Sequence, residues 1–325
     1  MEEIQELKFL KNNFESLNYN IIYYKNEVLL IVSNKNNKLV FMHGYFQKDK
    51  QSENHSIKQS KYNQYVLKEN YKLIVFETNP LNAFCPKISD SYKYFRVCLE
   101  SPFHSQSKYL INEKDYFYDI LDNYNLTIKP WQKKGKNIII FMDSCKDCGY
   151  TTTIDVFEWV NNCINKIRKQ KCNKKIIIRF KCIREDENKT FKKINDTIQF
   201  THNNKIIKIK DPINNFDYDR NLNIDKNSEQ KRDISYIFND AYCTIINASS
   251  ICVMSLIFGV PVFTHNKDSL VYGFSNENLK DINKIQYCNR NKLFRLFSNQ
   301  MFSIKNIKTI DFINHLLEND YFKKI

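Results

Sequence analysis

The sequence predicts an α/β protein with two Rossmann-like domains that face a cleft. The chain has 325 residues, which is long for one domain and suits two of about 150 residues each. Hydrophobic residues make up 42% of it and charged residues 26%, as in ordinary globular proteins. In its second half, apolar strand-like runs alternate with helical periodicity, which is typical of a parallel sheet with crossover helices.

The first half contains short runs of β-branched and aromatic residues, which predict strands. These runs cover residues 21–24, 28–32, 39–42, 72–76 and 92–99, and a helical pattern covers 113–123. Two polar stretches, 48–61 and 214–232, predict exposed loops. Pro130 and Gly135 separate the two structured halves, and Trp131 between them is expected to anchor the linker. The predicted domains are therefore 1–130 and 131–325.

The second half has the clearer pattern. Continuous apolar runs at Asn137–Met142 and Lys175–Phe180 predict buried parallel strands. Between them, apolar residues recur at helical spacing from Val156 to Ile167, which completes a strand–helix–strand unit. A second unit follows, with a helix at 233–239, a strand at 243–246, a helix at 250–258 and a strand at 261–263. Gly259 is placed to end the last of these helices.

The net charge of +14 has two interpretations. Lys, Asn, Ile, Tyr and Phe are all enriched and all have A/T-rich codons, so base composition alone could raise the lysine content. Alternatively, the protein binds an anion, such as a phosphate-bearing small molecule, nucleic acid or a membrane surface. The basic residues are scattered among acids, and this disfavours nucleic acid, which calls for a clustered stripe.

The sequence shows no targeting or membrane-spanning signal. The start, Met1-Glu2-Glu3, lacks the apolar region of a signal peptide, and no run approaches the ~20 apolar residues of a membrane span. We therefore expect a cytoplasmic protein, in which the ten cysteines are small buried hydrophobic residues. The pair Cys145 and Cys148 forms a C-x-x-C, but a zinc site needs a second ligand pair at suitable spacing, so no metal is expected.

The most informative segment is 241–263, AYCTIINASSICVMSLIFGVPVF. The chain leaves a strand at Ile246, turns through Asn247 and Ser249, and enters a helix at about Ser250. In open α/β sheets, ligands bind beyond the carboxyl ends of the strands, where helix N-termini offer unpaired N–H groups. A diphosphate fits this place, with the two serines as hydroxyl donors. The alternative is that Asn and Ser serve only as helix caps.

This segment resembles the donor-side domain of GT-B glycosyltransferases, in particular the set carried by phages and large DNA viruses. Further matches follow in the family's order: Tyr94-Phe95-Arg96, Trp131 to Gly135, Gly149-Tyr150-Thr151, Trp159, Ile177-Ile178-Arg179 and Phe302-Ser303-Ile304. The chain departs from the family in three places. No His-Pro follows Arg179, Met254 stands where many members have a ribose-binding Glu, and Asp143-Ser144 replaces a Gln-Arg pair.

The resemblance implies a glycosyltransferase that moves a sugar from a nucleotide-activated donor to a glycan or protein acceptor, without metal or cofactor. Domain 131–325 would bind the nucleotide-sugar, and domain 1–130 the acceptor. The donor-binding residues would be Gly149, Tyr150, Thr151, Arg179, Asn247, Ser249, Ser250 and His265. For a viral protein, the location would be the host cytoplasm.

A general base would come from the acceptor side, because inverting transfer needs one. His43 and Glu77 are the candidate catalytic residues, since each follows a predicted strand, although a structural role is open for both. Arg179 has an alternative as well, a surface ion pair with Glu185 or Asp186. Two rival functions remain: a catalytically inactive GT-B-fold binding protein, and a nucleic-acid-binding protein supported only by the charge.

Overall fold

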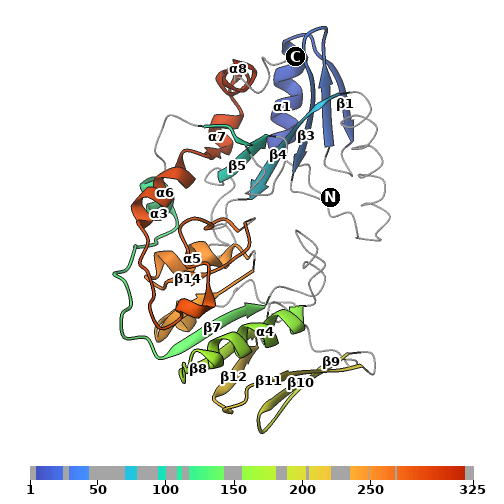
Figure 1. Ribbon diagram of the computed structural model, residues 1–325. Helices are drawn as coiled ribbons and strands as arrows, with labels where there is room; N and C mark the ends of the chain where they lie inside the picture. Colours follow the sequence, from blue (N-terminus) through green and yellow to red (C-terminus); the bar gives the residue numbers. More distant parts are fainter. Residues whose placement is uncertain are drawn as a thin grey trace. The chain divides into compact units, whose positions relative to one another are not determined.

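The computed structural model describes residues 5–24, 29–43, 70–78, 94–99, 108–111, 117–142, 156–180, 189–202, 205–220, 235–247, 249–267 and 269–318 (Figure 1). The chain has the predicted α/β class and divides into two compact units. Residues 1–125 and 294–325 form the first unit, and residues 126–293 form the second. The C-terminal segment thus packs with the first unit, whereas the sequence placed it with the second half.

The described part of the first unit holds a seven-stranded sheet in the order β1–β2–β3–β4–β5–β15, with β6 beside β5. These strands are β1 (Asn20–Tyr24), β2 (Leu29–Ser33), β3 (Lys38–His43), β4 (Lys72–Thr78), β5 (Tyr94–Leu99), β6 (Lys108–Tyr109) and β15 (Met301–Ser303). Among them, only β3 and β4 pair in parallel. A Rossmann-like sheet is therefore not confirmed in this unit. Neighbouring strands such as β2 and β3 are joined by a tight turn, and such turns allow only antiparallel pairing.

One face of this sheet carries the main core of the first unit. Helix α1 (Gln5–Ser16) and the C-terminal helices α7 (Ile304–Ile307) and α8 (Ile310–Glu318) pack on that face. The ring of Phe76 in β4 contacts those of Phe41, Phe95 and Phe312, with centroids 6.2–6.4 Å apart. The segment after residue 293 belongs to the first unit because Phe312, Ile313 and Leu316 complete this core. Two further helices, α3 (Phe117–Asn123) and α6 (Arg290–Ser298), meet through stacked rings of Phe117 and Phe294.

The second unit is built on a five-stranded sheet in the order β12–β8–β7–β13–β14, and every pairing in it is parallel. Its strands are β7 (Asn137–Met142), β8 (Lys175–Phe180), β12 (Phe216–Arg220), β13 (Ala241–Ile245) and β14 (Val262–Phe263). Four of these strands were predicted. The prediction of a loop over 214–232 is wrong at β12, because Phe216 and Tyr218 alternate with Asp residues and point into the core from the sheet's outer strand.

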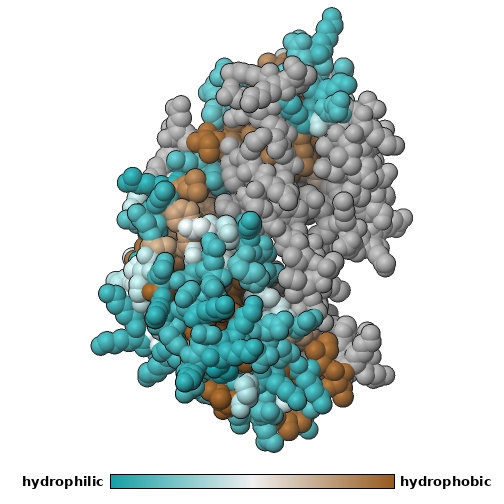
Figure 2. All heavy atoms as spheres, in the orientation of Figure 1, coloured by the Kyte–Doolittle hydropathy of each residue, from teal (hydrophilic) through white to brown (hydrophobic). Residues whose placement is uncertain are grey.

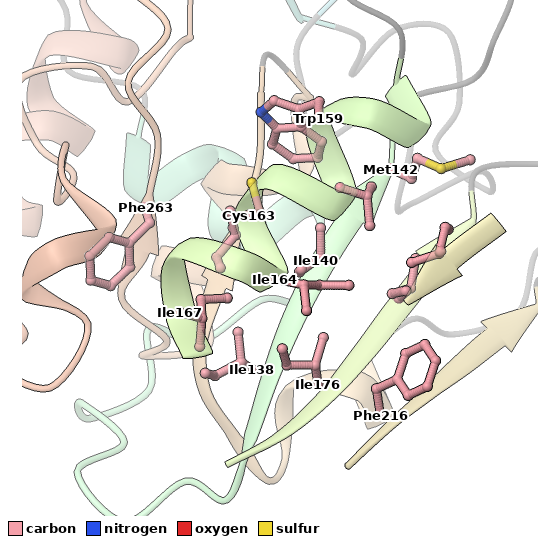
Figure 3. Close-up of a cluster of buried hydrophobic side chains, with 14 of the residues drawn as sticks. Ile138, Ile140, Met142, Trp159, Cys163, Ile164, Ile167, Ile176, Phe216 and Phe263 are labelled. Atoms are coloured by element: carbon pink, nitrogen blue, oxygen red, sulfur yellow. The ribbon is translucent and has the colours of Figure 1, made fainter. Parts of the chain in front are cut away.

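Both faces of the parallel sheet are covered. Helix α4 (Val156–Lys169) lies on one face, where its apolar side chains pack on Ile138, Ile140, Ile176 and Phe216 (Figure 3). On the other face, Phe238 of the short helix η6 (Ser235–Phe238) contacts Phe141 of β7 and Phe258 after helix α5 (Ile251–Ile257). Coverage on both sides explains why β7 and β8 read as unbroken apolar runs.

A three-stranded antiparallel sheet stands in the connection between β8 and β12, where a doubly wound fold usually has a helix. Its strands are β9 (Lys189–Ile194), β10 (Thr197–His202) and β11 (Lys205–Lys210). Ile198 and Ile209 join the core beside α4. Asn161 of α4 holds the β11 edge, since its side chain donates to the carbonyl of Lys208 and accepts from the backbone N–H of Lys210. The sequence did not reveal this insertion.

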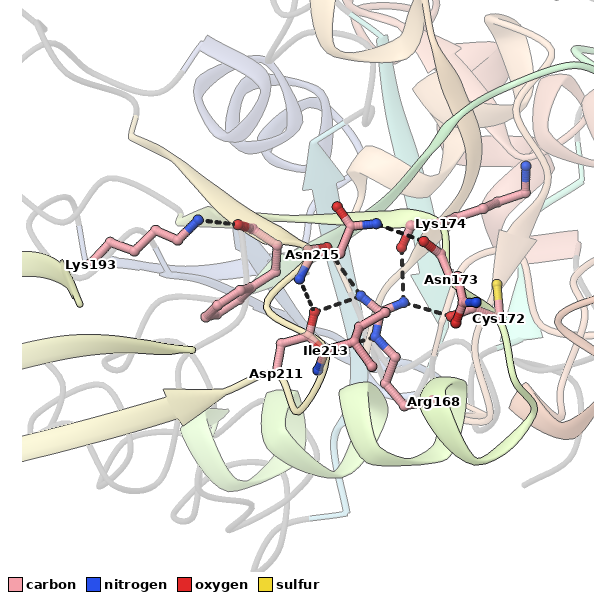
Figure 4. A network of polar contacts seen from close by, with 9 residues as sticks. Arg168, Cys172, Asn173, Lys174, Lys193, Asp211, Ile213 and Asn215 are labelled. Carbon is pink, nitrogen blue, oxygen red and sulfur yellow. Dashed lines mark hydrogen bonds and ion pairs between the residues drawn. The ribbon is translucent and has the colours of Figure 1, made fainter. Parts of the chain in front are cut away.

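A buried ion pair ties the insertion to the main sheet (Figure 4). The Arg168 guanidinium donates to both carboxylate oxygens of Asp211, at 2.8 and 2.6 Å, and the two side chains are 5% and 0% exposed. The same guanidinium donates to the carbonyls of Cys172, Lys174 and Asn215. The end of α4, the start of β8 and the start of β12 are thereby held at one point.

The predicted linker is locked onto the second unit. The ring of Trp131 contacts that of Tyr287, and the Arg290 guanidinium lies 4.0 Å from its centroid, which confirms the expected anchor. Gly259 ends α5 as predicted, with φ +75°, and its backbone passes directly beneath the carbonyl of Pro130. The backbone N–H groups of Lys129 and Gln132 donate to Ile257 and Gly259, so the linker is hydrogen-bonded at both ends of this crossing.

We expect Arg168→Met to lower the free energy of unfolding of the second unit by about 3–5 kcal/mol, because Asp211 would stay buried without its charge partner. Both tryptophans, Trp131 and Trp159, lie in this unit, so tryptophan fluorescence in a urea titration reports its unfolding. Lys175→Met is the matched control. It breaks the Lys175–Asp217 ion pair, whose side chains are 44% and 47% exposed, and should cost less than about 1 kcal/mol. Equal losses in the two variants would contradict the role of burial.

Gly259→Ala tests the crossing beneath Pro130. At Gly273, with φ +80°, an added Cβ meets no atom within 4 Å, so Gly273→Ala should cost only the left-handed backbone penalty of about 1 kcal/mol. At Gly259 the Cβ would overlap the Pro130 carbonyl as well, which should add about 1–3 kcal/mol. The measurement is again the urea midpoint followed by tryptophan fluorescence. A Gly259 variant as stable as the Gly273 variant would show that the linker moves aside freely.

Candidate functional site

The carboxyl ends of the parallel strands in the second unit form the candidate site. From β7 the chain proceeds outward to β8 and β12 on one side, and then returns to add β13 and β14 on the other. The strand order therefore reverses between β7 and β13. Ligands of open α/β sheets bind in the crevice at such a reversal, because the connections leave the sheet in opposite directions there.

Asn247 follows β13 at this point and is bound to the segment that follows β14. Its backbone carbonyl accepts a hydrogen bond from Thr264 Oγ at 2.9 Å, and its side-chain Oδ1 accepts one from Asn266 Nδ2 at 3.1 Å. Thr264 is 2% exposed, so its hydrogen bond to Asn247 is buried within the second unit. The loops after β13 and β14 are thus joined into one polar surface.

Ser249 and Ser250 precede α5 and are both partly exposed. Their carbonyls accept the first helical hydrogen bonds, from Cys252 and Val253, so the helix begins where the sequence placed it. Among the described residues, no backbone N–H donates a capping hydrogen bond to the Ser250 hydroxyl. The interpretation that this serine serves only as a cap is therefore not supported. Helix α5 has only seven residues, so the site depends on side chains and not on a long helix dipole.

His265 follows β14 and keeps much of its ring exposed. Partial burial and the nearby positive charge of Lys166 on α4 lower the pKa of this imidazole from its ordinary value of 6.5. The ring is therefore neutral at pH 7. A neutral imidazole next to a lysine can donate one hydrogen bond to an anion, and an anion bound there would raise its pKa again.

Arg179 lies near the carboxyl end of β8, and its side chain is buried, with 5% exposed. Its guanidinium donates to the hydroxyl of Tyr236 in η6 at 2.5 Å. Phe180, not Arg179, is the last residue of β8. Strand β7 separates β8 from β13, so the Arg179 backbone lies about 10 Å from β13. Arg179 is thus near the reversal point but is already hydrogen-bonded within the second unit.

The remaining predicted residues fall elsewhere. His43 ends β3 and Glu77 lies near the end of β4, so each stands at a strand end of the first unit, and the structure pairs these two strands in parallel. Gly149, Tyr150 and Thr151 lie outside the described residues, as do Cys145 and Cys148.

Sequence reasoning missed several residues that the structure brings to the site. Thr264 and Asn266 flank His265, and both are hydrogen-bonded to Asn247. Lys166 and Tyr236 come from α4 and η6 and act on His265 and Arg179. The polar triplet after the apolar strand 261–263 could have indicated Thr264 and Asn266. Nothing in the sequence pattern could have indicated Lys166 or Tyr236, because each depends on how a helix packs.

Among the residues that the structure describes, no three His, Cys, Asp or Glu side chains converge to hold a metal ion. None of the described helices is both long enough and apolar enough to cross a membrane.

We expect an NMR titration to give His265 a pKa below 6.5, and Lys166→Gln to raise it, because the variant removes a neighbouring positive charge. Since the folded pKa lies below the unfolded value, the unfolded chain binds the proton first. His265 therefore lowers stability as the pH falls from above about 6.5 through its folded pKa. A pKa that Lys166→Gln leaves unchanged would exclude Lys166 as a cause.

Comparison with protein-family models and with curated proteins finds no match for this chain. Its function must therefore be inferred from the chemistry of the site. The site offers hydroxyl and amide groups from two adjacent strand ends, with the imidazole of His265 and the nearby ammonium of Lys166. These groups suit an anionic ligand with several oxygen atoms.

Proposed function

We propose that the chain is a glycosyltransferase of GT-B type, which moves a sugar from a nucleotide-activated donor to a glycan or protein acceptor. The observation that carries the proposal is the strand order of the second unit. Counted along the chain, its five parallel strands follow the order 3-2-1-4-5, which is that of the nucleotide-binding doubly wound fold. Asn247 and Ser249 lie just beyond the reversal point, where that fold holds its ligand.

The second unit would bind the donor through its diphosphate. The hydroxyls of Ser249 and Ser250 and the ring N–H of His265 are suited to hydrogen-bond phosphate oxygens. Hydrogen bonds from fixed donors to the departing phosphate would stabilise the charge that develops as the sugar leaves. The Asn247–Asn266 and Asn247–Thr264 hydrogen bonds support this role, because they connect the segment after β13 to the segment after β14. Gly149, Tyr150 and Thr151 would line the same site, as the resemblance implies.

Arg179 would contribute through its charge. Its guanidinium already donates to Tyr236, so its positive charge would act on a phosphate at longer range. The first unit would supply the acceptor site and the base that removes the acceptor's proton. His43 and Glu77 support that assignment by their positions at the ends of adjacent parallel strands, where active-site residues are commonly found.

Donor binding is tested by a thermal-shift titration with a panel of nucleotide sugars and nucleoside diphosphates, followed by a hydrolysis and transfer assay. Ser249→Ala/Ser250→Ala should weaken donor binding at least about 10-fold, because hydrogen bonds to a charged phosphate are lost. Ser249→Thr/Ser250→Thr keeps both hydroxyls and is the matched control. Unchanged donor affinity in the alanine variant would contradict the assignment of these serines.

A catalytically inactive binding protein of the same fold is the second candidate. The buried state of Met254 favours it, because this side chain is 2% exposed and packs within α5, at the position where many GT-B enzymes hold the ribose with a Glu. In the same panel, this candidate predicts that a nucleotide sugar stabilises the protein without being hydrolysed or transferred. Turnover of any donor would exclude it, and the absence of any thermal shift would count against both candidates.

A further inference from the structure

The three-stranded sheet β9–β10–β11 is a concentration of positive charge outside the proposed donor site. Between residues 189 and 210 the sequence has six lysines, and Asp196 is the one acid. One face of this sheet is buried, because Ile198 and Ile209 pack into the core of the second unit. The opposite face has no function in the donor site, and its lysines and isoleucines are exposed to solvent.

The strand register gives the composition of this outward face. Lys192, Gln199 and Lys208 form one row across the three strands. Ile194, Thr197 and Lys210 form the next row, and Ile206 lies one row to the other side. We name the residues Lys192, Ile194, Ile206, Lys208 and Lys210 the outward lysine face.

The three lysines of this face have no partner among the acids that the structure describes, and all three are exposed. Lys193 differs from them, because its ammonium donates to the Phe216 carbonyl on the buried side (Figure 4). Lys192 and Lys208 stand on the outer strands, about 10 Å apart, and Lys208 and Lys210 are about 7 Å apart along one strand. Three separate positive charges are thus presented on one face of this sheet.

Two aliphatic side chains lie among these charges. Ile206 is 60% exposed and Ile194 is 39% exposed. In Figure 2, brown hydrophobic atoms stand among teal hydrophilic ones at the lower end of the second unit, where Figure 1 places β9, β10 and β11. A mixture of exposed lysine and isoleucine is suited to a surface whose outer layer is anionic and whose interior is apolar.

We propose that the outward lysine face binds the surface of a bilayer that contains anionic phospholipids. The lysines would pair with headgroup phosphates and carboxylates, and Ile206 and Ile194 would enter the headgroup layer. Single-stranded nucleic acid fits this face less well, because none of its described residues is aromatic and bases would have nothing to stack on. This contact is peripheral, it needs no spanning helix, and it does not depend on the proposed sugar transfer.

Vesicle sedimentation of the full chain tests the proposal. We expect binding to phosphatidylcholine vesicles that contain roughly 30% phosphatidylserine, which resemble an anionic leaflet. We expect no binding to vesicles of phosphatidylcholine alone. Lys192→Gln/Lys208→Gln/Lys210→Gln should weaken binding on the order of 100-fold, and raising the salt to about 0.5 M should release the wild type. Tryptophan fluorescence checks that the variant is folded.

The matched control is Lys169→Gln/Lys280→Gln/Lys284→Gln, which removes the same charge from exposed positions elsewhere on the second unit. This control should bind vesicles within a few-fold of the wild type. Ile206→Ser removes no charge, and it should still weaken binding because Ile206 would enter the headgroup layer. Equal losses in the two triple variants would overturn the proposal, as would equal binding to both kinds of vesicle. A single-stranded oligonucleotide that displaces the vesicles would assign the face to nucleic acid instead.

Discussion

The second unit depends on the buried pair of Arg168 and Asp211. A charged pair with so little exposure is tolerated only when every remaining donor and acceptor is satisfied, and here the guanidinium also binds three backbone carbonyls. The Asp211 carboxylate in turn accepts from the backbone N–H of Asn215. The pair therefore sets where α4 ends and where β8 and β12 begin. Of the described donor-binding candidates, Arg179 lies near the other end of β8, and the rest follow β13 and β14 in the same sheet.

A second constraint acts from the side of the linker. Gly135 and Gly259 are places where two backbones approach too closely for any side chain, against Ala241 and Pro130. The segment 129–136 is consequently part of the second unit and not a loose tether. Both close approaches involve the elements that flank β13 and α5, so they help to position Asn247 and the two serines. These close approaches constrain the backbone beside the polar surface at the strand ends, and fixed donors favour the binding of a phosphate.

The two proposals use the positive charge of the chain differently. At the strand ends, the hydroxyl, amide and imidazole groups of the described residues would provide directional hydrogen bonds to one small anion. On the outward lysine face, three exposed ammonium groups with no partner among the described acids provide attraction without direction, which suits an extended anionic surface. The insertion β9–β11 makes this division possible, because it replaces a crossover helix with a sheet that has one face in the core and one in solvent.

The sequence by itself determined the parallel sheet and the start of the candidate site. The run 137–142 is continuous and apolar, which specifies a strand. In 241–263, Asn247, Ser250 and Gly259 separate the apolar runs, so local pattern alone specifies strand, turn and helix. Only the tertiary structure decided the rest. The insertion, the return of residues 294–325 to the first core, the Arg168–Asp211 pair and the bonds from Thr264 and Asn266 to Asn247 all join residues distant in sequence or in separate elements. Such contacts leave no periodic signal, because each partner alone looks like an ordinary polar or apolar residue.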